Sequence, residues 1–483
     1  MRVLESLEPT KVFYFFEEIC QIPHGSGNVG AISDYLKRFA EERKLEVYQD
    51  AIKNIVIIKK ASDGYEEEPP VILQGHMDMV AVHKPELNMD MTREPLKLRV
   101  DGDNIYAEGT SLGGDDGIAV AYALAILDDD SIKHPRLEVV ITVDEDTGMD
   151  GAREIDLSML KGSRLLNLDS EEEGIFLTSC AGGAKVNCKL PAVFTKMEGL
   201  AYELVLGGLT GGHSGVEIHK ERGNANKLAG RLLWYLYLKE INVGLVSAQG
   251  GLADNAIPRE TKLNILVEGT QKEAFEEALK AFEQEVKTEL ATKDPAFHVD
   301  MKSCGTVTEK AICGNGFAVV AAFLNSLPNG VQAMSADIQG LVETSLNLGI
   351  LKVNEDGVEA SFAVRSSVES SKNALIERLM SVVVLAGGEA QADGIYPGWA
   401  YRVNSPLREK MITLYKEMYG EEPKVEAIHA GLECGLLASK IADLDCVSFG
   451  PNMSNIHTTE ETLSISSTLR VWKYLIALLE RKG

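Results

Sequence analysis

Two stretches near the N-terminus, residues 12–19 and 32–39, repeat apolar side chains at the i, i+3, i+4, i+7 spacing of a helix. Short apolar runs typical of buried strands follow at 54–58, 71–73, 137–143 and 164–168. A helix predicted over 117–127 separates the second run from the third. Strands that alternate with helices in this way predict an α/β layer with a mostly parallel sheet.

Around Gly182-Gly183 the pattern changes, and alternating apolar and polar positions appear. Strands are predicted at 202–206, 262–267, 297–301, 344–351 and 359–365, and helices at 224–238, 272–290, 317–324 and 372–385. This order is typical of a two-layer α/β unit, and the block is long enough for two, although no sequence repeat establishes a doubling. After Tyr396-Pro397-Gly398-Trp399 the first style returns, with helices at 406–418 and 463–479 around a strand at 446–449. The predicted architecture is an α/β domain, residues 1–185 and 388–483, interrupted by an inserted two-layer α/β domain, residues 186–387.

The composition predicts a soluble globular protein. The 483 residues are 45% hydrophobic and 25% charged, and a formal net charge of -25 disfavours nucleic acid and anionic membranes as partners. The seven Cys include no C-x-x-C pair, so neither a disulfide framework nor a thiolate zinc site is predicted. The N-terminus lacks an apolar signal core, and no apolar run is long enough to span a membrane. These features together predict a cytoplasmic location.

Potential metal ligands follow the predicted strands. They are His76 and Asp78 after 71–73, Glu145 and Asp146 after 137–143, Asp169 after 164–168, His457 after 446–449, and Asp115 before a helix. Because open α/β sheets place their sites at the carboxyl ends of strands, these side chains are expected to meet at one edge of a sheet. Singly, such residues are more often structural or solvated. Converging imidazoles and carboxylates, however, suit two zinc ions, with cobalt or manganese as substitutes.

Four motifs resemble those of the zinc metallopeptidase family that contains carnosinases, peptidase T and the desuccinylases. They are Gly75-His76-Met77-Asp78, Gly114-Asp115-Asp116-Gly117, Asp144-Glu145-Asp146-Thr147-Gly148 and Ser454-Asn455-Ile456-His457-Thr458, in the family's order and across almost the whole chain. The length, Ile22-Pro23-His24, Tyr396-Pro397-Gly398-Trp399 and His429-Ala430-Gly431-Leu432-Glu433-Cys434 are similar to the aminoacyl-histidine branch of that family, also called Xaa-His or cytosol non-specific dipeptidases. The resemblance implies that the α/β domain is a di-zinc catalytic domain and that the inserted domain is its lid.

Carried over to this sequence, the resemblance implies two Zn²⁺ per chain, for which Co²⁺ or Mn²⁺ can substitute. The ligands would be His76 and Asp169 for one ion, His457 and Asp146 for the other, and Asp115 as the bridge. Asp78 would orient the imidazole of His76, and Glu145 would be the general base. The Asp115–Asp116 peptide bond would be cis. At Asp146 the sequence departs from the family, which usually has a second glutamate there, so this ligand is one methylene shorter.

The inserted domain carries three further motifs of this kind. Gly211-Gly212-His213-Ser214-Gly215 resembles the family's lid histidine, which binds the substrate's carbonyl oxygen. The motifs Asp254-Asn255-Ala256-Ile257-Pro258 and Ala363-Val364-Arg365 resemble its substrate-clamping motifs, with Asn255 and Arg365 as the contacting residues. Without the resemblance, these segments would be interpreted as turns and a surface arginine.

The implied reaction is hydrolysis of dipeptides, such as β-alanyl-histidine and other unblocked dipeptides, by a metal-bridging water with Glu145 as base. The protein would act as a monomer or homodimer. An N-acyl amino-acid deacylase or a tripeptidase is the alternative among enzymes, because one metal site serves several amide substrates. An inactive metal- or peptide-binding relative is the alternative from another class. The presence of Glu145 argues against it, since a binding module needs no base.

Overall fold

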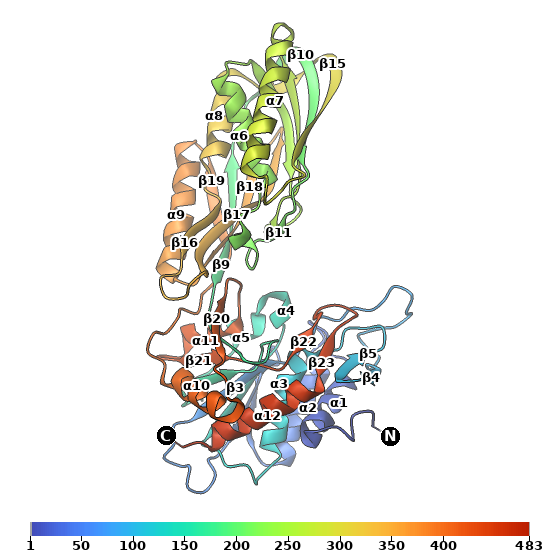
Figure 1. Cartoon of the computed structure of the whole chain (residues 1–483), viewed down its shortest axis with the longest axis vertical. Coiled ribbons are helices and arrows are strands. Elements are labelled where there is room, and N and C mark those ends of the chain that lie inside the picture. The colour runs from blue at the N-terminus through green and yellow to red at the C-terminus, as the bar shows by residue number, and fades with distance from the viewer. Residues whose placement is uncertain (1, 483) are drawn as a thin grey trace. The chain divides into compact units, whose positions relative to one another are not determined.

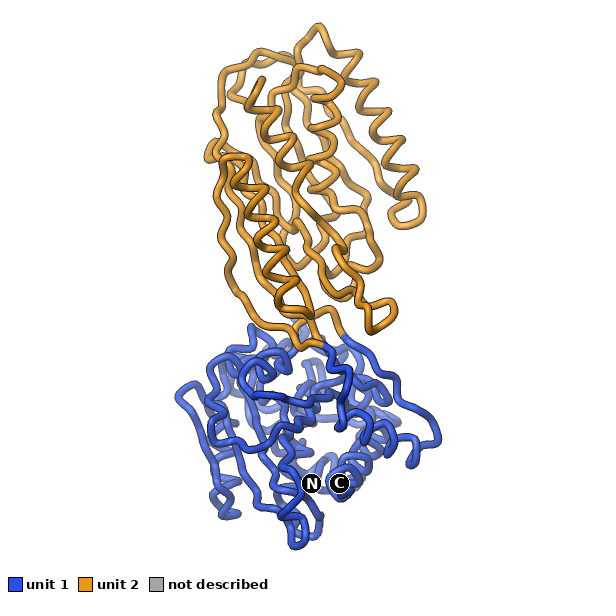
Figure 2. The backbone as a smooth tube through the Cα atoms, turned by 90° about the vertical axis from the view of Figure 1, so that its left-hand side faces the viewer, with its two compact units in different colours: residues 1–179, 401–427, 432–483 blue, residues 180–400, 428–431 orange. Residues whose placement is uncertain are grey.

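The chain forms two units, each built from segments that are distant in sequence (Figure 2). This computed structural model describes residues 2–482. Unit 1 contains residues 1–179, 401–427 and 432–483, and unit 2 contains residues 180–400 and 428–431. Residues 180–185 and 388–400, assigned from the sequence to the interrupted domain, thus pack within unit 2. They do so because strands β9 (Gly182–Leu190) and β19 (Glu389–Tyr396) pair with each other in the sheet of that unit.

Unit 1 is built on an eight-stranded sheet with the order β1-β2-β6-β3-β7-β21-β8-β20. Its strands are β1 (Glu46–Gln49), β2 (Ile55–Lys59), β3 (Val71–His76), β6 (Leu137–Thr142), β7 (Arg164–Asn167), β8 (Ile175–Cys180), β20 (Lys424–Ile428) and β21 (Asp445–Ser448). The central neighbours β6, β3, β7 and β21 are parallel, as predicted, whereas β1 and β2 are joined antiparallel. Strands β2, β3, β6 and β21 are buried at every residue, so both faces of the sheet's centre are covered.

The helices of unit 1 come from all three of its segments (Figure 1). They are α1 (Thr10–Cys20), α2 (Gly30–Glu42), α3 (Gly114–Leu127), α4 (Glu145–Gly148), α5 (Asp150–Glu154), α10 (Pro406–Tyr419), α11 (Glu433–Lys440) and α12 (Ile465–Glu480). Helix α3 is buried along its whole length and packs against α1 and β3. A small sheet has the order β22 (Met453–Ser454), β23 (Thr462–Ser464), β5 (Asn104–Ala107) and β4 (Leu98–Asp101).

Unit 2 contains an antiparallel sheet of nine strands with helices packed against it (Figure 1). Besides β9 and β19, the strands are β10 (Phe194–Gly207), β12 (Val243–Gly250), β14 (Thr261–Val267), β15 (His298–Ile312), β16 (Gly330–Met334), β17 (Val342–Asn354) and β18 (Gly357–Ser366). The helices are α6 (Ala225–Leu238), α7 (Lys272–Glu289), α8 (Gly314–Ser326) and α9 (Glu369–Leu385), with short 3₁₀ turns η1 (Ile218–Lys220) and η2 (Gly269–Gln271). Two short strands, β11 (Gly212–His213) and β13 (Ala256–Ile257), pair separately. None of the helices within residues 2–482 is long and apolar enough to cross a membrane.

Candidate metal centre

The predicted ligands lie at the carboxyl end of the parallel strands of unit 1. His76 is the last residue of β3, Asp169 follows β7, and Glu145-Asp146 opens α4 after β6. Parallel neighbours end at the same edge of a sheet, which brings these three loops together. Two more loops reach this edge: the turn with Asp115 at the start of α3, and the loop between β22 and β23 with His457.

The carboxylate of Asp115 lies between two imidazoles. Its Oδ1 is 3.2 Å from Nε2 of His76, and its Oδ2 is 3.0 Å from Nε2 of His457. Each imidazole also faces a second carboxylate. Oδ1 of Asp169 lies 3.7 Å from Nε2 of His76, and Oδ1 of Asp146 lies 3.0 Å from Nε2 of His457. The structure thus brings all five residues together, and the short side chain of Asp146 reaches its imidazole.

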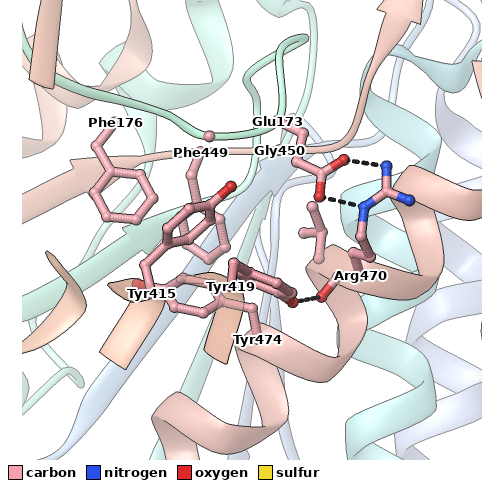
Figure 3. Close-up of a pocket in the computed structure, with 10 residues that line it drawn as sticks. Glu173, Phe176, Tyr415, Tyr419, Phe449, Gly450, Arg470 and Tyr474 are labelled. Atoms are coloured by element: carbon pink, nitrogen blue, oxygen red, sulfur yellow. Dashed lines mark hydrogen bonds and ion pairs between the residues drawn. The ribbon is translucent and has the colours of Figure 1, made fainter. Parts of the chain in front are cut away.

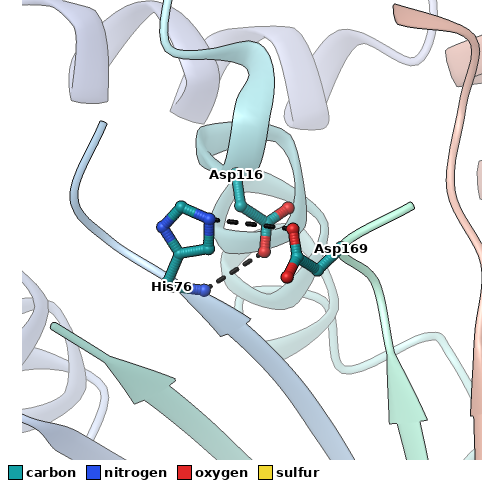
Figure 4. A group of neighbouring side chains, drawn as sticks. All are labelled: His76, Asp116 and Asp169. Carbon is teal, nitrogen blue, oxygen red and sulfur yellow. Dashed lines mark hydrogen bonds and ion pairs between the residues drawn. The ribbon is translucent and has the colours of Figure 1, made fainter. Parts of the chain in front are cut away.

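A sixth residue, Asp116, adds a fourth carboxylate to the cluster and was not predicted as part of the site from the sequence. Its Oδ2 accepts a hydrogen bond from the backbone N–H of His76 at 3.1 Å (Figure 4). Potential ligand atoms of Asp116, His76 and Asp169 all lie within 4.8 Å of one another. The Asp115–Asp116 peptide bond is cis, as the resemblance implied. The second Asp of the motif was a visible signal, but adjacent carboxylates alone do not indicate that both face one site.

The cluster gathers negative charge in a buried place, and this chemistry fits bound cations. Burial raises the pKa of Asp116 well above its ordinary value and that of Asp169 to about 6, so ionisation of these two carboxyls is unfavourable without nearby positive charge. Oδ2 of Asp146 is buried and has no hydrogen-bond partner among residues 2–482. Imidazole nitrogens and carboxylates directed at one another are ligands that zinc prefers. The residues present therefore fit a centre for two divalent ions.

Asp78 and Glu145 flank the cluster and contact each other. Oδ1 of Asp78 lies 3.3 Å from Nδ1 of His76 and accepts the backbone N–H of Glu145 at 3.2 Å. Oδ2 of Asp78 accepts the hydroxyl of Ser26 at 2.8 Å. A carboxylate on Nδ1 fixes the ring so that Nε2 faces the cluster. Burial raises the pKa of Glu145 well above its ordinary value, which suits a group that must hold a proton during a reaction.

A buried polar network lies between the strands that carry these ligands. Oε2 of Glu433 accepts the side-chain amide of Gln74 and the hydroxyl of Thr142, both at 2.6 Å. Gln74 in turn accepts the amide of Asn167 at 2.5 Å. Burial raises the pKa of Glu433 to about 8. No chemical role was predicted for Glu433 from the sequence, although it lies in the His429–Cys434 motif that supported the resemblance.

The lid histidine inferred from the sequence lies in unit 2, at the end of β11. Nδ1 of His213 accepts hydrogen bonds from the backbone N–H groups of Gly215 and Val216, both at 3.2 Å. Because Nδ1 is an acceptor, the ring hydrogen of the neutral imidazole is on Nε2, which is then a donor. Burial lowers the pKa of His213, and the positive charge of Arg365 lowers it further. The ring is therefore a neutral hydrogen-bond donor at pH 7.

The other two inferred substrate contacts also lie in unit 2. Asn255 and His213 line a hollow of about 910 Å³. Arg365, on β18, donates from Nη1 to the hydroxyl of Tyr396 at 3.2 Å, and its Nε is buried with no partner in the described part of the chain. A buried guanidinium N–H of this kind is suited to an anionic or carbonyl group of a ligand.

Another hollow, in unit 1, is too small for a substrate (Figure 3). Aromatic side chains that include Phe176, Tyr415 and Tyr474 line it, and the carboxylate of Glu173 closes it through two hydrogen bonds of 2.6 Å with Arg470. Its volume of about 10 Å³ is at the lower limit for one water molecule. It belongs to the packing of the core.

Comparisons with known proteins identify the family of the chain. A sequence model of peptidase family M20/M25/M40 matches residues 72–481. The chain belongs to this family. The membership inferred from the four motifs is thereby confirmed.

Two relatives match this M20 peptidase over nearly its whole length. It is 36% identical over 487 residues to the cytosol non-specific dipeptidase of Escherichia coli (strain K12), with 99% of each chain covered. Its structure superposes on the aminoacylhistidine dipeptidase of Vibrio alginolyticus with a TM-score of 0.93 at 35% identity, covering 99% of this chain and 98% of the other. The aminopeptidase PepT of Bacillus cereus, at 15% identity and a TM-score of 0.55, shares the fold, with 98% of each chain covered. The predicted fold class, an α/β peptidase, is confirmed.

Proposed function

We propose that this chain hydrolyses dipeptides with free termini, using two divalent ions, preferably zinc, and Glu145 as the general base. The observation that carries the proposal is the carboxylate of Asp115 between the imidazoles of His76 and His457, at 3.2 and 3.0 Å. Asp169 would complete the ligands of the His76 ion, and Asp146 those of the His457 ion. The names of the two full-length relatives support dipeptides as the substrate class.

When bound, the ions supply the Lewis acidity that polarises a carbonyl and makes water nucleophilic near neutral pH. Glu145 accepts the proton of the attacking water as the oxygen–carbon bond forms. It then delivers that proton to the leaving amine as the carbon–nitrogen bond breaks. General acid–base assistance of this kind contributes roughly 10²–10⁴-fold to the rate. Asp78 keeps the His76 ring in the orientation that this geometry needs.

The residues of unit 2 would bind the substrate. His213 would donate its Nε2–H to the carbonyl oxygen as that oxygen gains negative charge. Arg365 would hold the free carboxylate of the dipeptide with its fork of N–H groups, and Asn255 would clamp the peptide beside it. Capture of both free ends leaves little room for extension, so long peptides should be poor substrates. The name of the Escherichia coli relative supports a cytoplasmic enzyme, and the net charge of -25 supports the absence of nucleic-acid and anionic membrane partners; we propose a monomer or homodimer.

The test is a metal analysis combined with a substrate panel. Elemental analysis of the dialysed protein should find about two metal ions per chain. The panel compares β-alanyl-histidine, plain dipeptides, N-acetylated dipeptides and tripeptides, with Glu145→Gln as the matched inactive control. Efficient cleavage of the unblocked dipeptides, β-alanyl-histidine and plain dipeptides, is expected, and poor cleavage of the N-acetylated dipeptides and tripeptides. Preferential cleavage of N-acetylated substrates or tripeptides would overturn the dipeptidase proposal, and a chain with no metal would overturn the site.

A further inference from the structure

Glu461 is a buried acidic residue on the loop that carries His457, between β22 and β23. Its side chain is 3% exposed. The carboxylate accepts hydrogen bonds from four consecutive backbone N–H groups of a distant segment. These donors are Leu112 (2.7 Å) and Gly113 (3.1 Å) to Oε2, and Gly114 (2.8 Å) and Asp115 (3.4 Å) to Oε1.

The backbone of residues 112–115 is shaped for this anion. Gly113 has a φ of +69°, in the left-handed region, so successive N–H groups turn toward the same point. Helix α3 begins at Gly114, and the N–H groups of a first turn have no partner within the helix. A Cβ at Gly114 would lie 3.2 Å from Oε1 of Glu461, which is a tight contact. The carboxylate thus caps the helix start at close range.

The hydrogen bonds of Glu461 connect residues 112–115 with the loop between β22 and β23, and each of these two segments carries a proposed metal ligand. One ends in Asp115, and the other carries His457 four positions before Glu461. These two residues approach each other at 3.0 Å, although 342 positions separate them in sequence. We propose that Glu461 is a positioning residue that fixes the loop of His457 against the Asp115 turn and so sets the geometry of the second metal ion. The inference rests on the metal centre of the proposed function.

Substitution with glutamine isolates this role. In Glu461→Gln one of the two acceptor oxygens becomes an NH₂ group, which would point its hydrogens at backbone N–H donors. Two of the four hydrogen bonds are then replaced by repulsion, and the loop must shift away from the turn. Glu461→Asp keeps the charge, but its side chain is one methylene shorter, so the carboxylate lies farther from the backbone N–H groups of residues 112–115. The matched control is Glu460→Gln, because Glu460 is the adjacent residue, is exposed, and forms a surface ion pair with Lys84 at 2.7 Å.

The experiment titrates the metal-depleted full-length chain with Co²⁺ and records the visible absorption of each bound ion, with thermal unfolding in parallel. Wild type and Glu460→Gln should bind two ions with equal affinities and spectra. Glu461→Gln should bind the second ion roughly 10- to 100-fold more weakly, with an altered spectrum. Its kcat should fall while KM stays near the wild-type value, since no substrate contact is lost.

If Glu461→Gln binds both Co²⁺ ions with wild-type affinity and an unchanged spectrum, the positioning role of Glu461 is overturned, while the proposed function stands. If Glu461→Gln fails to fold, Glu461→Asp is tested in its place. Weaker binding of the second ion by Glu461→Asp supports the inference, and wild-type binding overturns it. A wild-type chain that binds no Co²⁺ would instead overturn the proposed function, and with it this inference. The two failures are therefore distinguishable.

Discussion

The buried carboxyl of Glu433 should make the metal-depleted protein less stable as the pH rises. Burial raises its pKa from 4.5 to about 8. Between these values the folded state keeps the proton, whereas the unfolded state has released it. Because the folded state binds more protons in this window, the stabilisation is complete below about pH 4.5 and is lost as the pH rises through 8.

The size of the effect follows from the two pKa values. A tenfold change in proton affinity corresponds to about 1.4 kcal/mol, so the distance from 4.5 to about 8 corresponds to a loss of up to about 5 kcal/mol. This loss is a large part of the free energy of unfolding of a typical domain, which is roughly 5–15 kcal/mol. Glu433→Gln retains an oxygen for the hydrogen bonds from Gln74 and Thr142 but has no proton to lose. It should therefore be more stable than wild type at about pH 8.

Urea unfolding of the chelator-treated full-length chain, from about pH 5 to about pH 8, measures this difference. The wild type should lose stability across the window, and Glu433→Gln should lose much less. Glu422→Gln is the control, because Glu422 is exposed and its ion pair with Lys416 lowers the pKa of its carboxyl. It should follow the wild type. If Glu433→Gln also falls in parallel with the wild type, the carboxyl does not hold a proton in the fold and the reasoning is refuted.

Four further outcomes are expected. Glu145→Gln should keep both metal ions by elemental analysis but lose roughly 10²–10⁴-fold in kcat on a dipeptide, and wild-type turnover would remove Glu145 from its role. Asp115→Asn should weaken the binding of both metal ions, measured by competition with a chelator, because the two oxygens of Asp115 face the imidazoles of His76 and His457 at 3.2 and 3.0 Å. Two ions still tightly bound in this variant would contradict a bridging role. His213→Ala should lower kcat by roughly 10²–10³-fold through loss of its Nε2–H donor. If His213 serves its own chain, a subunit-exchanged mixture of His213→Ala with Glu145→Gln should stay inactive, and recovered activity would show that the histidine crosses between subunits.

The placement of His76 and Asp169 was predictable because each follows an apolar run that indicates a buried strand. The apolar runs of β3 and β7 locate strand ends, and a parallel sheet brings such ends together at one edge. His76 and Asp169 therefore could be assigned to one place from their positions in the sequence alone. His457 and Asp115 were expected at the same edge, but the bridging role of Asp115 toward His457 came from the family resemblance, since a loop of seven residues between two very short strands has no periodicity that fixes its course.

The features that escaped prediction depend on contacts between distant segments. Glu433 and Glu461 each lie at a helix start or in a loop, where a glutamate is usually solvated, and nothing local indicates that their carboxylates point inward. Strand β15 was predicted only to 301 but continues to Ile312. Its additional residues are mostly exposed, so backbone pairing with β10 sustains the strand where apolar alternation is absent.

Burial in the core of unit 1 affects the ionisation of the carboxyls at the candidate metal centre. Strands β2, β3 and β6 are buried throughout, yet the edge where β3 and β6 end concentrates carboxylates for which burial disfavours ionisation, as the raised pKa values of Asp169, at about 6, and Glu433, at about 8, indicate. Divalent cations would reverse this preference, because positive charge favours the ionised form. Ions that bind the folded state more tightly than the unfolded state also stabilise the fold. The cations that the proposed reaction needs would thus offset the unfavourable ionisation of these ligands, and this explains how the edge where β3 and β6 end can hold so many buried acids.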